Sequence, residues 1–400
     1  MTRGTAVAAL DVGTSKVLCA VAVPEARGLR VVGFAQAGGA GVRRGAVVDV
    51  ALVAAAVREV AQRVRRHSGE PLPPLLVGSA GGQLFSANRH AEVAVAGRVG
   101  PGDVAACGDA LRRAELPAGY QLVHVIPQQY TIDGYEGCRD PAGMAASNLA
   151  LEAHLVACET AVLQNLWRAV EAADLRLQDF ALAGLAAAEA VLTEDERENG
   201  VLLLDCGAGA TQAVIVSGGE PVVTASVPLG GEHVTADIAA GLRLGRAQAE
   251  EVKRSHGQAD AGLASAERRV PLGADGGPPR DCSESELAEI VSARVEEIVQ
   301  AVVDIVARRG RGIPIGSGAV LTGGAAALRG LQAVAMRMLA MPVRLGGASG
   351  APDALGAPAS AAAVGLLQMQ ALRTAGGPRL RPFAGTARRG WLPRRAAAAQ

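Results

Sequence analysis

The stretch LLLDCGAGATQ, residues 202–212, places an apolar run, an acidic residue and a glycine-spaced loop in direct succession. The apolar run predicts a buried strand, and the Asp-x-Gly that closes it predicts a turn. The same succession occurs in AALDVGTSKVLCAVAV, residues 8–23. A second Val-rich run follows in each copy, at residues 213–216 and 17–23, so each copy predicts a hairpin with an acidic residue at its turn. Similarity between two stretches this far apart indicates a duplicated core.

Turns of this composition suit a phosphate group. Glycines let backbone amides approach an anion, and the hydroxyl groups of Thr14, Ser15 and Thr211 can add donors. Asp11 and Asp205 would repel a phosphate, so we predict that they bind Mg²⁺, through its water molecules, from two facing loops. A single Asp-x-Gly after a strand is more often an ordinary turn, and the prediction therefore depends on the duplication.

A third glycine pair lies in GAVLTGGAAALRGL, residues 318–331. The pattern predicts a strand that ends at Gly323 and Gly324 and is followed by a helix. Bare backbone at such a junction can accommodate a flat ligand or its phosphate, with the helix N-terminus facing it. Taken alone, the pair is better explained as a tight turn between strand and helix.

Lysine is rare in this chain and its positions are therefore informative. Of 39 basic residues, only Lys16 and Lys253 are lysines. Lys16 lies in the first glycine and hydroxyl loop, where a compact ammonium group can contact a phosphate. Lys253 is predicted to lie on a helix with Glu250 on the same face. That pair could bind the ribose hydroxyls and adenine edge of a nucleotide, or could be a solvated ion pair.

Composition excludes several classes of protein. A chain of 400 residues, half of them hydrophobic, can bury a large core divided into several domains. The formal charge is zero, so no overall field favours nucleic acid. The six cysteines form no Cys-x-x-Cys pair, which disfavours zinc and disulfides and favours a reducing cytosol. We expect no signal peptide and no membrane-spanning segment. The phosphate-binding P-loop and dinucleotide fingerprints are both missing from the sequence.

Several motifs together carry a resemblance to a known family. Two Asp-Gly hairpins, a Glu-x-x-Lys helix and a late Thr-Gly-Gly, in that order, resemble the actin and heat-shock chaperone ATPase superfamily. More narrowly, the chain resembles the FtsA family of bacterial cell-division proteins from about residue 6 to about residue 370. The stretches that carry this resemblance are GVRRGAVVDV (41–50), HVIPQQYTIDG (124–134), DPAGM (140–144), VTADIAAGLRLGRAQAEEVKRSHG (234–257) and AVLTGGAAALRGL (319–331).

The resemblance implies an α/β, actin-like two-lobed ATPase fold with duplicated ribonuclease-H-like cores and an inserted small α/β subdomain. We expect the first core at residues 1–83, 161–198 and 346–374, the last of these being its C-terminal helix. The second core is expected at residues 199–230 and 311–345. The remaining parts are the inserted subdomain (84–160), a peripheral nucleotide and partner subdomain (231–310), and a basic flexible linker with a membrane-targeting tail (375–400).

The resemblance also implies ATP and Mg²⁺ as ligands, with Asp11 and Asp205 as metal partners and catalytic residues. The nucleotide-binding residues it implies are Gly13, Thr14, Ser15 and Lys16 in the first phosphate loop, Gly207, Gly209 and Thr211 in the second, and Glu250, Lys253, Gly323 and Gly324 around the adenosine.

One departure from the family pattern bears on hydrolysis. The second loop typically reads D-x-G-G-G-T-T-D in the family and is DCGAGATQ here, so Gln212 replaces a carboxylate that could orient metal-bound water. We therefore expect nucleotide binding with weak ATPase activity at most. Glu189 is the candidate acceptor for the attacking water, or else a residue of a helix surface.

Family partners are implied as well. FtsA-like proteins polymerise on the cytoplasmic face of the inner membrane at the division site and bind the C-terminal peptide of FtsZ. Arg294, within the expected partner region 230–310, corresponds to a family arginine at that contact, or else is a snorkelling residue on an amphipathic helix. Residues 383–400, with Trp391 among arginines, occupy the place of a membrane anchor, although Pro393 interrupts a helix and a disordered basic tail is the alternative. Rival readings are a pilus-assembly-type actin-like adaptor and a small-molecule kinase of the same superfamily.

Overall fold

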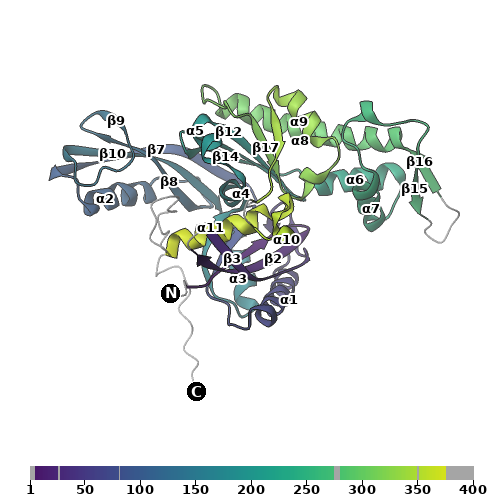
Figure 1. Cartoon of the computed structure of the whole chain (residues 1–400), viewed down its shortest axis with the longest axis horizontal. Coiled ribbons are helices and arrows are strands. Elements are labelled where there is room, and N and C mark those ends of the chain that lie inside the picture. Colours follow the sequence, from purple (N-terminus) through teal and green to yellow (C-terminus); the bar gives the residue numbers. More distant parts are fainter. Residues whose placement is uncertain (1–4, 26–27, 81, 274–279, 349–350, 375–400) are drawn as a thin grey trace, which may run out of the picture.

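A computed structural model describes residues 5–25, 28–80, 82–273, 280–348 and 351–374. Two five-stranded sheets form its framework (Figure 1). The first has the order β11-β6-β1-β2-β3, and the second has the order β18-β17-β12-β13-β14. The strands of the first are β1 (Val7–Val12), β2 (Lys16–Glu25), β3 (Gly28–Gly38), β6 (Leu75–Ser79) and β11 (Leu177–Leu182). Those of the second are β12 (Val201–Cys206), β13 (Thr211–Ser217), β14 (Glu220–Val227), β17 (Ala319–Thr322) and β18 (Val343–Leu345).

The two sheets share one topology. In each, the first three strands form an antiparallel meander, and two later strands add in parallel on the other side of the first strand. Asp11 and Asp205 are each the fifth residue of the first strand of their sheet. Each hairpin turn is closed by the same hydrogen bond, from Gly13 N to Lys16 O at 2.9 Å and from Gly207 N to Ala210 O at 3.0 Å. The predicted duplication of the core is confirmed.

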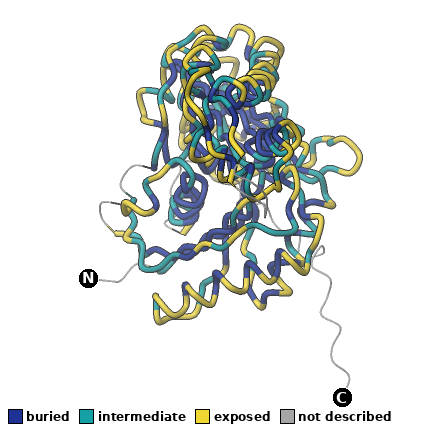
Figure 2. The backbone as a smooth tube through the Cα atoms, turned by 90° about the vertical axis from the view of Figure 1, so that its right-hand side faces the viewer, coloured by how far each residue is buried: buried dark blue, intermediate teal, exposed yellow. Residues whose placement is uncertain are grey.

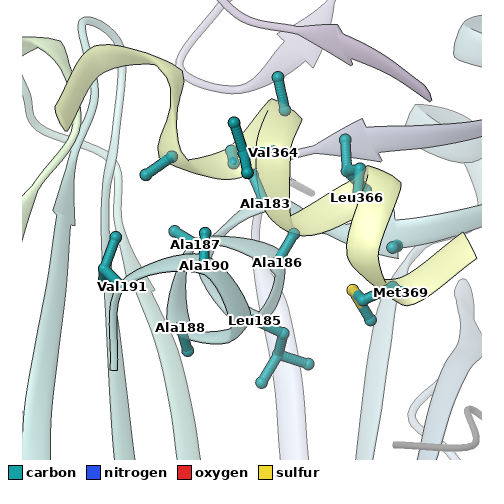
Figure 3. Close-up of a cluster of buried hydrophobic side chains, with 14 of the residues drawn as sticks. Ala183, Leu185, Ala186, Ala187, Ala188, Ala190, Val191, Val364, Leu366 and Met369 are labelled. Carbon is teal, nitrogen blue, oxygen red and sulfur yellow. The ribbon is translucent and has the colours of Figure 1, made fainter. Parts of the chain in front are cut away.

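Two helices form a layer shared by both sheets, α4 (Ala183–Val191) and α11 (Ala361–Thr374). Their alanine, valine and leucine side chains pack in one buried cluster with residues of β1, β2 and β6 on one side and of β12, β13 and β17 on the other (Figure 3). The helices cross very closely, because a Cβ atom on Gly365 would overlap the carbonyl oxygen of Ala186. The last described helix therefore joins the two halves of the molecule.

The outer faces of the sheets are covered by other helices. In the first core these are α1 (Val50–Ser68) and α3 (Thr160–Ala172), and in the second they are α8 (Glu284–Arg309) and α9 (Leu331–Leu339). Asp49 caps α1, because its Oδ1 accepts a hydrogen bond from Leu52 N at 3.0 Å. Buried residues gather inside each lobe, and exposed residues lie on the outer turns of the helices (Figure 2).

An inserted α/β subdomain extends from the first core. It contains α2 (Pro101–Arg112) and an antiparallel sheet of β7 (Leu84–Arg98), β10 (Ala145–Glu159), β8 (Tyr120–Ile132) and β9 (Tyr135–Cys138), in that spatial order. The insertion therefore has the mixed α/β content that the family resemblance implies. The subdomain rests on edge strand β14 of the second core, where Ser86 Oγ donates to Thr224 O at 2.7 Å and Gln128 Nε2 donates to Pro221 O at 3.1 Å. These bonds cover a sheet edge that would otherwise be open to other chains.

The peripheral part of the second lobe contains α6 (Gly231–Leu242), α7 (Arg246–His256), β15 (Arg269–Gly273) and β16 (Arg280–Ser283). Shorter elements are β4 (Val42–Arg43), β5 (Ala46–Val47), α5 (Glu194–Asn199), α10 (Asp353–Gly356) and the 3₁₀ turns Ala261–Leu263, Gly324–Ala327 and Pro358–Ser360. The tail at 375–400, for which a membrane-targeting segment was predicted, lies outside the described residues. Within those residues, no helix combines the length and apolarity needed to span a bilayer.

Candidate functional site

A cleft of about 1130 Å³ lies between the two cores. Its walls include both hairpin turns, the start of α6, one face of α7, the turn after β17 and the segment that leads into α11. The volume is sufficient for a nucleotide. The predicted residues that line this cleft are Asp11, Gly13, Thr14, Ser15, Lys16, Asp205, Gly207, Gly209, Thr211, Glu250, Lys253, Gly323 and Gly324.

The two hairpin turns face and touch each other. A Cβ atom on Gly209 would overlap Thr14 Oγ1 and would lie 3.0 Å from Arg44 N, so only glycine fits between the loops. The loops that carry Asp11 and Asp205 therefore converge on one site, as the duplicated pattern suggested.

Both aspartates lie at the carboxyl end of a central strand, where Asp11 is buried and Asp205 is half-buried. Desolvation and, to a smaller extent, the nearby charge of Asp11 raise the pKa of Asp205 to about 7, although Lys16 opposes the shift. Burial also raises the pKa of Asp11, again opposed by Lys16. Two carboxyl groups that resist ionisation side by side form a site that a cation would stabilise.

Lys16 holds a segment of chain far away in the sequence. Its Nζ donates a hydrogen bond to the carbonyl oxygen of Ala359. The neighbouring Pro358 carbonyl accepts hydrogen bonds from Gly323 N at 3.1 Å and Thr322 Oγ1 at 3.2 Å. Residues 357–360 therefore form a strap across the cleft, bonded to both cores and continuous with α11.

Glu250 and Lys253 belong to a partly buried hydrogen-bond network and are not simply a solvated ion pair. Lys253 Nζ lies 2.6 Å from Glu250 Oε2, 2.8 Å from Thr235 Oγ1 and 3.0 Å from Gly231 O. The Lys253 side chain is only 14% exposed. This network fixes α7 against the start of α6 and shapes the wall of the cleft.

The glycine pair after β17 is required by its surroundings. Gly323 has φ +85°, and a Cβ atom there would lie 2.5 Å from both Asp205 Oδ1 and Cys206 O. The prediction of a helix directly after the pair is wrong. Gly324–Ala327 form a 3₁₀ turn, and α9 begins only at Leu331, because the extended backbone of Leu328 and the left-handed backbone of Gly330 (φ +81°) interrupt the helix.

Thr211 and Glu189 differ in environment from the expectation. The Thr211 hydroxyl donates to Leu229 O at 2.9 Å, so it is already used within the protein. Glu189 is not among the described residues that line the cleft, and its Oε2 lies 3.1 Å from Arg197 Nη2. The helix places Glu189 nearly two turns beyond Ala183, which does line the cleft.

Arg294 lies on α8 and makes ion pairs with Asp237 of α6 and with Glu297 of its own helix. Its Nε lies 2.6 Å from Asp237 Oδ2, its Nη2 lies 3.1 Å from Asp237 Oδ1, and Nη1 also contacts Glu297. It therefore links α8 to α6 rather than snorkelling alone at the surface.

Some residues of the cleft were not identified from the sequence. Arg246, Arg254 and Arg329 add positive charge to the wall around Lys253, and Thr235 completes its network. The sequence showed only that Gln212 replaces a carboxylate of the family pattern. In the structure, its amide bridges Ala80 and Gly184 of the first core. No local pattern signals such contacts, because they join segments that are distant in the sequence.

Two cores of one topology around a shared cleft define the actin-like class of proteins. Comparison with solved structures supports this fold class. The chain matches a PilM-PilN type IV pilus biogenesis complex with a TM-score of 0.64 at 18% identity, covering 92% of this chain and 98% of that one. It matches MreB5 of Spiroplasma citri bound to ADP with a TM-score of 0.57 at 14% identity, covering 94% and 98%. At these identities the likeness shows the fold alone.

The chain belongs to the FtsA family of cell-division proteins. It is 36% identical over 370 residues to the cell division protein FtsA of Pseudomonas aeruginosa, covering 91% of this chain and 89% of that protein. Family models for the cell division protein FtsA and for the SHS2 domain inserted in FtsA match residues 202–365 and 81–157 respectively. The predicted family is confirmed, and membership in a cell-division family argues against the pilus-assembly and small-molecule kinase readings.

Proposed function

We propose that this protein binds Mg-ATP in the cleft between its cores and acts as an actin-like adaptor in cell division. The observation that carries the proposal is the convergence of two equivalent Asp-Gly turns on one cleft. The binding of ADP by the solved MreB5 supports a nucleotide as the ligand.

The cleft residues suggest separate roles in binding the nucleotide. Lys16 and the turns of Gly13–Ser15 and Gly207–Gly209 would contact the phosphates. Glu250, Lys253 and the bare backbone of Gly323 and Gly324 would contact the adenosine.

Asp11 and Asp205 fit Mg²⁺. Their raised pKa values mean that a divalent cation would remove an electrostatic penalty. No group of three or more His, Cys, Asp or Glu side chains gathers in the part of the chain that the structure describes, which suits a metal that keeps most of its ligands as water and phosphate. The magnesium would neutralise phosphate charge. With Glu189 away from the cleft and an amide at Gln212, we expect weak hydrolysis at most.

The partners follow from the family. We propose that the protein polymerises on the cytoplasmic face of the inner membrane at the division site, and that it tethers FtsZ through the C-terminal peptide of that filament. The α6 and α8 surface around Arg294 would receive the peptide, and residues 383–400 would contact anionic lipid. Because Asp237 and Glu297 already neutralise Arg294, the peptide would have to compete with or extend that network.

Nucleotide binding is tested by calorimetric titration with Mg-ATP. We expect saturable binding that Asp205→Asn reduces at least tenfold and that Glu189→Gln, a carboxyl change outside the cleft lining, leaves unchanged. Equal affinity in the two variants would contradict the assignment of the cleft.

Partner binding is tested by co-sedimentation with anionic vesicles and with FtsZ. Deletion of residues 383–400 should remove vesicle binding but not FtsZ binding, and Arg294→Ala should do the reverse. If the intact protein binds neither vesicles nor FtsZ, the adaptor role is rejected.

A further inference from the structure

We propose that Gln212 is a positioning residue that latches the two cores together at the base of the nucleotide cleft. Its Nε2 donates a hydrogen bond to Ala80 O at 2.6 Å, and its Oε1 accepts one from Gly184 N. Gln212 belongs to β13 of the second core, whereas Ala80 follows β6 of the first core and Gly184 lies at the start of α4. The proposal rests on nucleotide binding in the cleft and adds a means of controlling it.

The chemistry of the latch requires an amide. The side chain is 1% exposed and faces one backbone acceptor and one backbone donor. A carboxylate could accept from Gly184 but would set a second acceptor against the Ala80 carbonyl. Gly184 is fitted to this contact, because a Cβ atom there would lie 2.6 Å from Gln212 Oε1. Gln212 stands where the family pattern has a carboxylate, and its amide makes hydrogen bonds to Ala80 and Gly184.

The latch is placed where it can sense the ligand. Gln212 is the strand partner of Asp205 in the β12 and β13 hairpin. On the other side, Ala80 ends the segment in which Gly78 pairs with Asp11. The two bonds therefore set the spacing of the turns that carry both aspartates. Any ligand that changes this spacing must act on the latch, and the latch must in turn change the affinity for that ligand.

The test compares two substitutions of nearly equal length. Gln212→Met removes both hydrogen bonds without adding charge, and Gln212→Glu keeps the acceptor for Gly184 but loses the donor for Ala80. Gln128→Met is the matched control, because Gln128 also bonds a carbonyl of the second core, at Pro221, outside the cleft.

We expect Gln212→Met to weaken Mg-ATP binding about tenfold, since the cores are no longer held at the binding spacing. Amide hydrogen exchange at Gly184 should be fast in Gln212→Met and protected in Gln212→Glu and the wild type. A residue that merely filled space would not produce this difference between the variants. The Gln128→Met control should keep both the affinity and the protection.

The latch proposal is rejected if a folded Gln212→Met variant keeps both the Mg-ATP affinity of the wild type and its slow amide exchange at Gly184. The measurement also separates the latch from the proposed function. If the wild type binds no Mg-ATP, nucleotide binding is rejected, while the exchange pattern in the free protein still decides whether the latch exists. Asp205→Asn should differ from Gln212→Met, because it should weaken Mg-ATP binding while the Gly184 amide stays protected from exchange.

Discussion

At the scale of single residues, the aspartates of the cleft are held in an environment that disfavours their charged form. They lie close enough for the charge of Asp11 to raise the pKa of Asp205, and Lys16 partly offsets the resulting penalty. Residues kept for binding at a cost in stability are expected where a ligand completes the site.

Because the charged form of Asp205 is disfavoured, we predict that the effect of Asp205→Asn on the free energy of unfolding depends on pH. The folded pKa of about 7 lies above the ordinary 3.8, so between these values the folded protein retains a proton that the unfolded chain has released. Stability from this group is therefore present at low pH and is lost as pH rises towards 7. Without ligand at pH 8, Asp205→Asn should be more stable than the wild type by roughly 3 kcal/mol.

Chemical denaturation at pH 4 and pH 8 measures this difference, which should nearly vanish at the lower pH. Added Mg-ATP should stabilise the wild type more than the variant. A variant that is less stable than the wild type at pH 8 would show that the carboxylate is already compensated within the protein.

The sequence predicted individual residues only where a local pattern identified them. Asp11, Asp205, Lys16 and the glycines were found because each lies in a repeated or rare motif. The contact of Lys16 with Ala359 and the latch of Gln212 were not found, since each joins segments brought together only by the complete fold.

At the scale of elements, the crossing of α4 and α11 is the tightest contact between helices described above. The prediction concerns Gly365→Ala. Because the new methyl group would overlap the Ala186 carbonyl, the helices must separate, and we expect a loss of about 3 kcal/mol or more in unfolding free energy.

The matched control for Gly365→Ala is Gly102→Ala in α2. A Cβ atom at Gly102 has no neighbour within 4 Å among the described residues. Alanine is the better helix former, so this variant should change stability by less than about 1 kcal/mol. Similar effects of the two substitutions on the denaturation midpoint would argue against close packing at the crossing.

The contact of the inserted subdomain with β14 should be sensitive to acid. His154 is buried there, with Nδ1 2.6 Å from Asn88 Oδ1 and Nε2 2.9 Å from Thr224 Oγ1. Burial lowers its pKa to about 3, and the charge of Arg309 contributes. The unfolded chain takes up a proton below the ordinary pKa of 6.5 and the folded protein does not, so stability falls as pH decreases from 6.5 to 3.

We therefore predict that His154→Gln is less stable than the wild type at pH 7 by about 1 kcal/mol, through weaker hydrogen bonds, and that the difference shrinks or reverses by pH 4. The difference between variant and wild type at each pH is the quantity to measure, because Asp205 contributes a slope of the opposite sign. His90→Gln, on the exposed part of β7, is the control. A constant difference across this range would exclude His154 as the acid-sensitive group.

Helices and strands were predicted correctly where the sequence has a clear periodic pattern. They were predicted wrongly where contacts in the complete fold determine the backbone conformation. The hairpins, the strand before Gly323 and α7 follow from apolar patterns and turn residues. The 3₁₀ turn at Gly324–Ala327 was predicted as a helix, because an alanine run favours helix locally, whereas the extended Leu328 and the left-handed Gly330 end the turn before α9 begins.

At the scale of the whole molecule, the shared layer makes the two lobes depend on one C-terminal helix. We predict that a chain ending at residue 352 exposes the apolar faces of both sheets. It should bind a hydrophobic dye and aggregate, because residues of β1, β2 and β6 and of β12, β13 and β17 all lose cover.

A chain ending at Thr374 is the control for this truncation, since it keeps α11 and removes only the tail. It should unfold in one cooperative transition like the full chain. A well-folded product from the shorter chain would mean that α4 alone is enough to fill the layer.

The architecture could be predicted from the sequence because the duplication appears in two short motifs. Once two hairpins with equivalent aspartates are recognised, the facing cores and the cleft follow. The strap at residues 357–360 and the shared layer could not be predicted, since runs of alanine do not specify which surfaces they contact.

The position of α11 in the chain also bears on how the protein is made. A ribosome releases the strands of both sheets, and the entire inserted subdomain, before it releases residues 361–374. Domains usually fold in order as they emerge, but here neither lobe can close its inner face until the last described helix is translated. The strands of the first sheet are all made by Leu182 and those of the second only by Leu345. The nascent chain therefore carries an open apolar face on the first sheet from that point until α11 emerges, and it should depend on a chaperone that shields such strands.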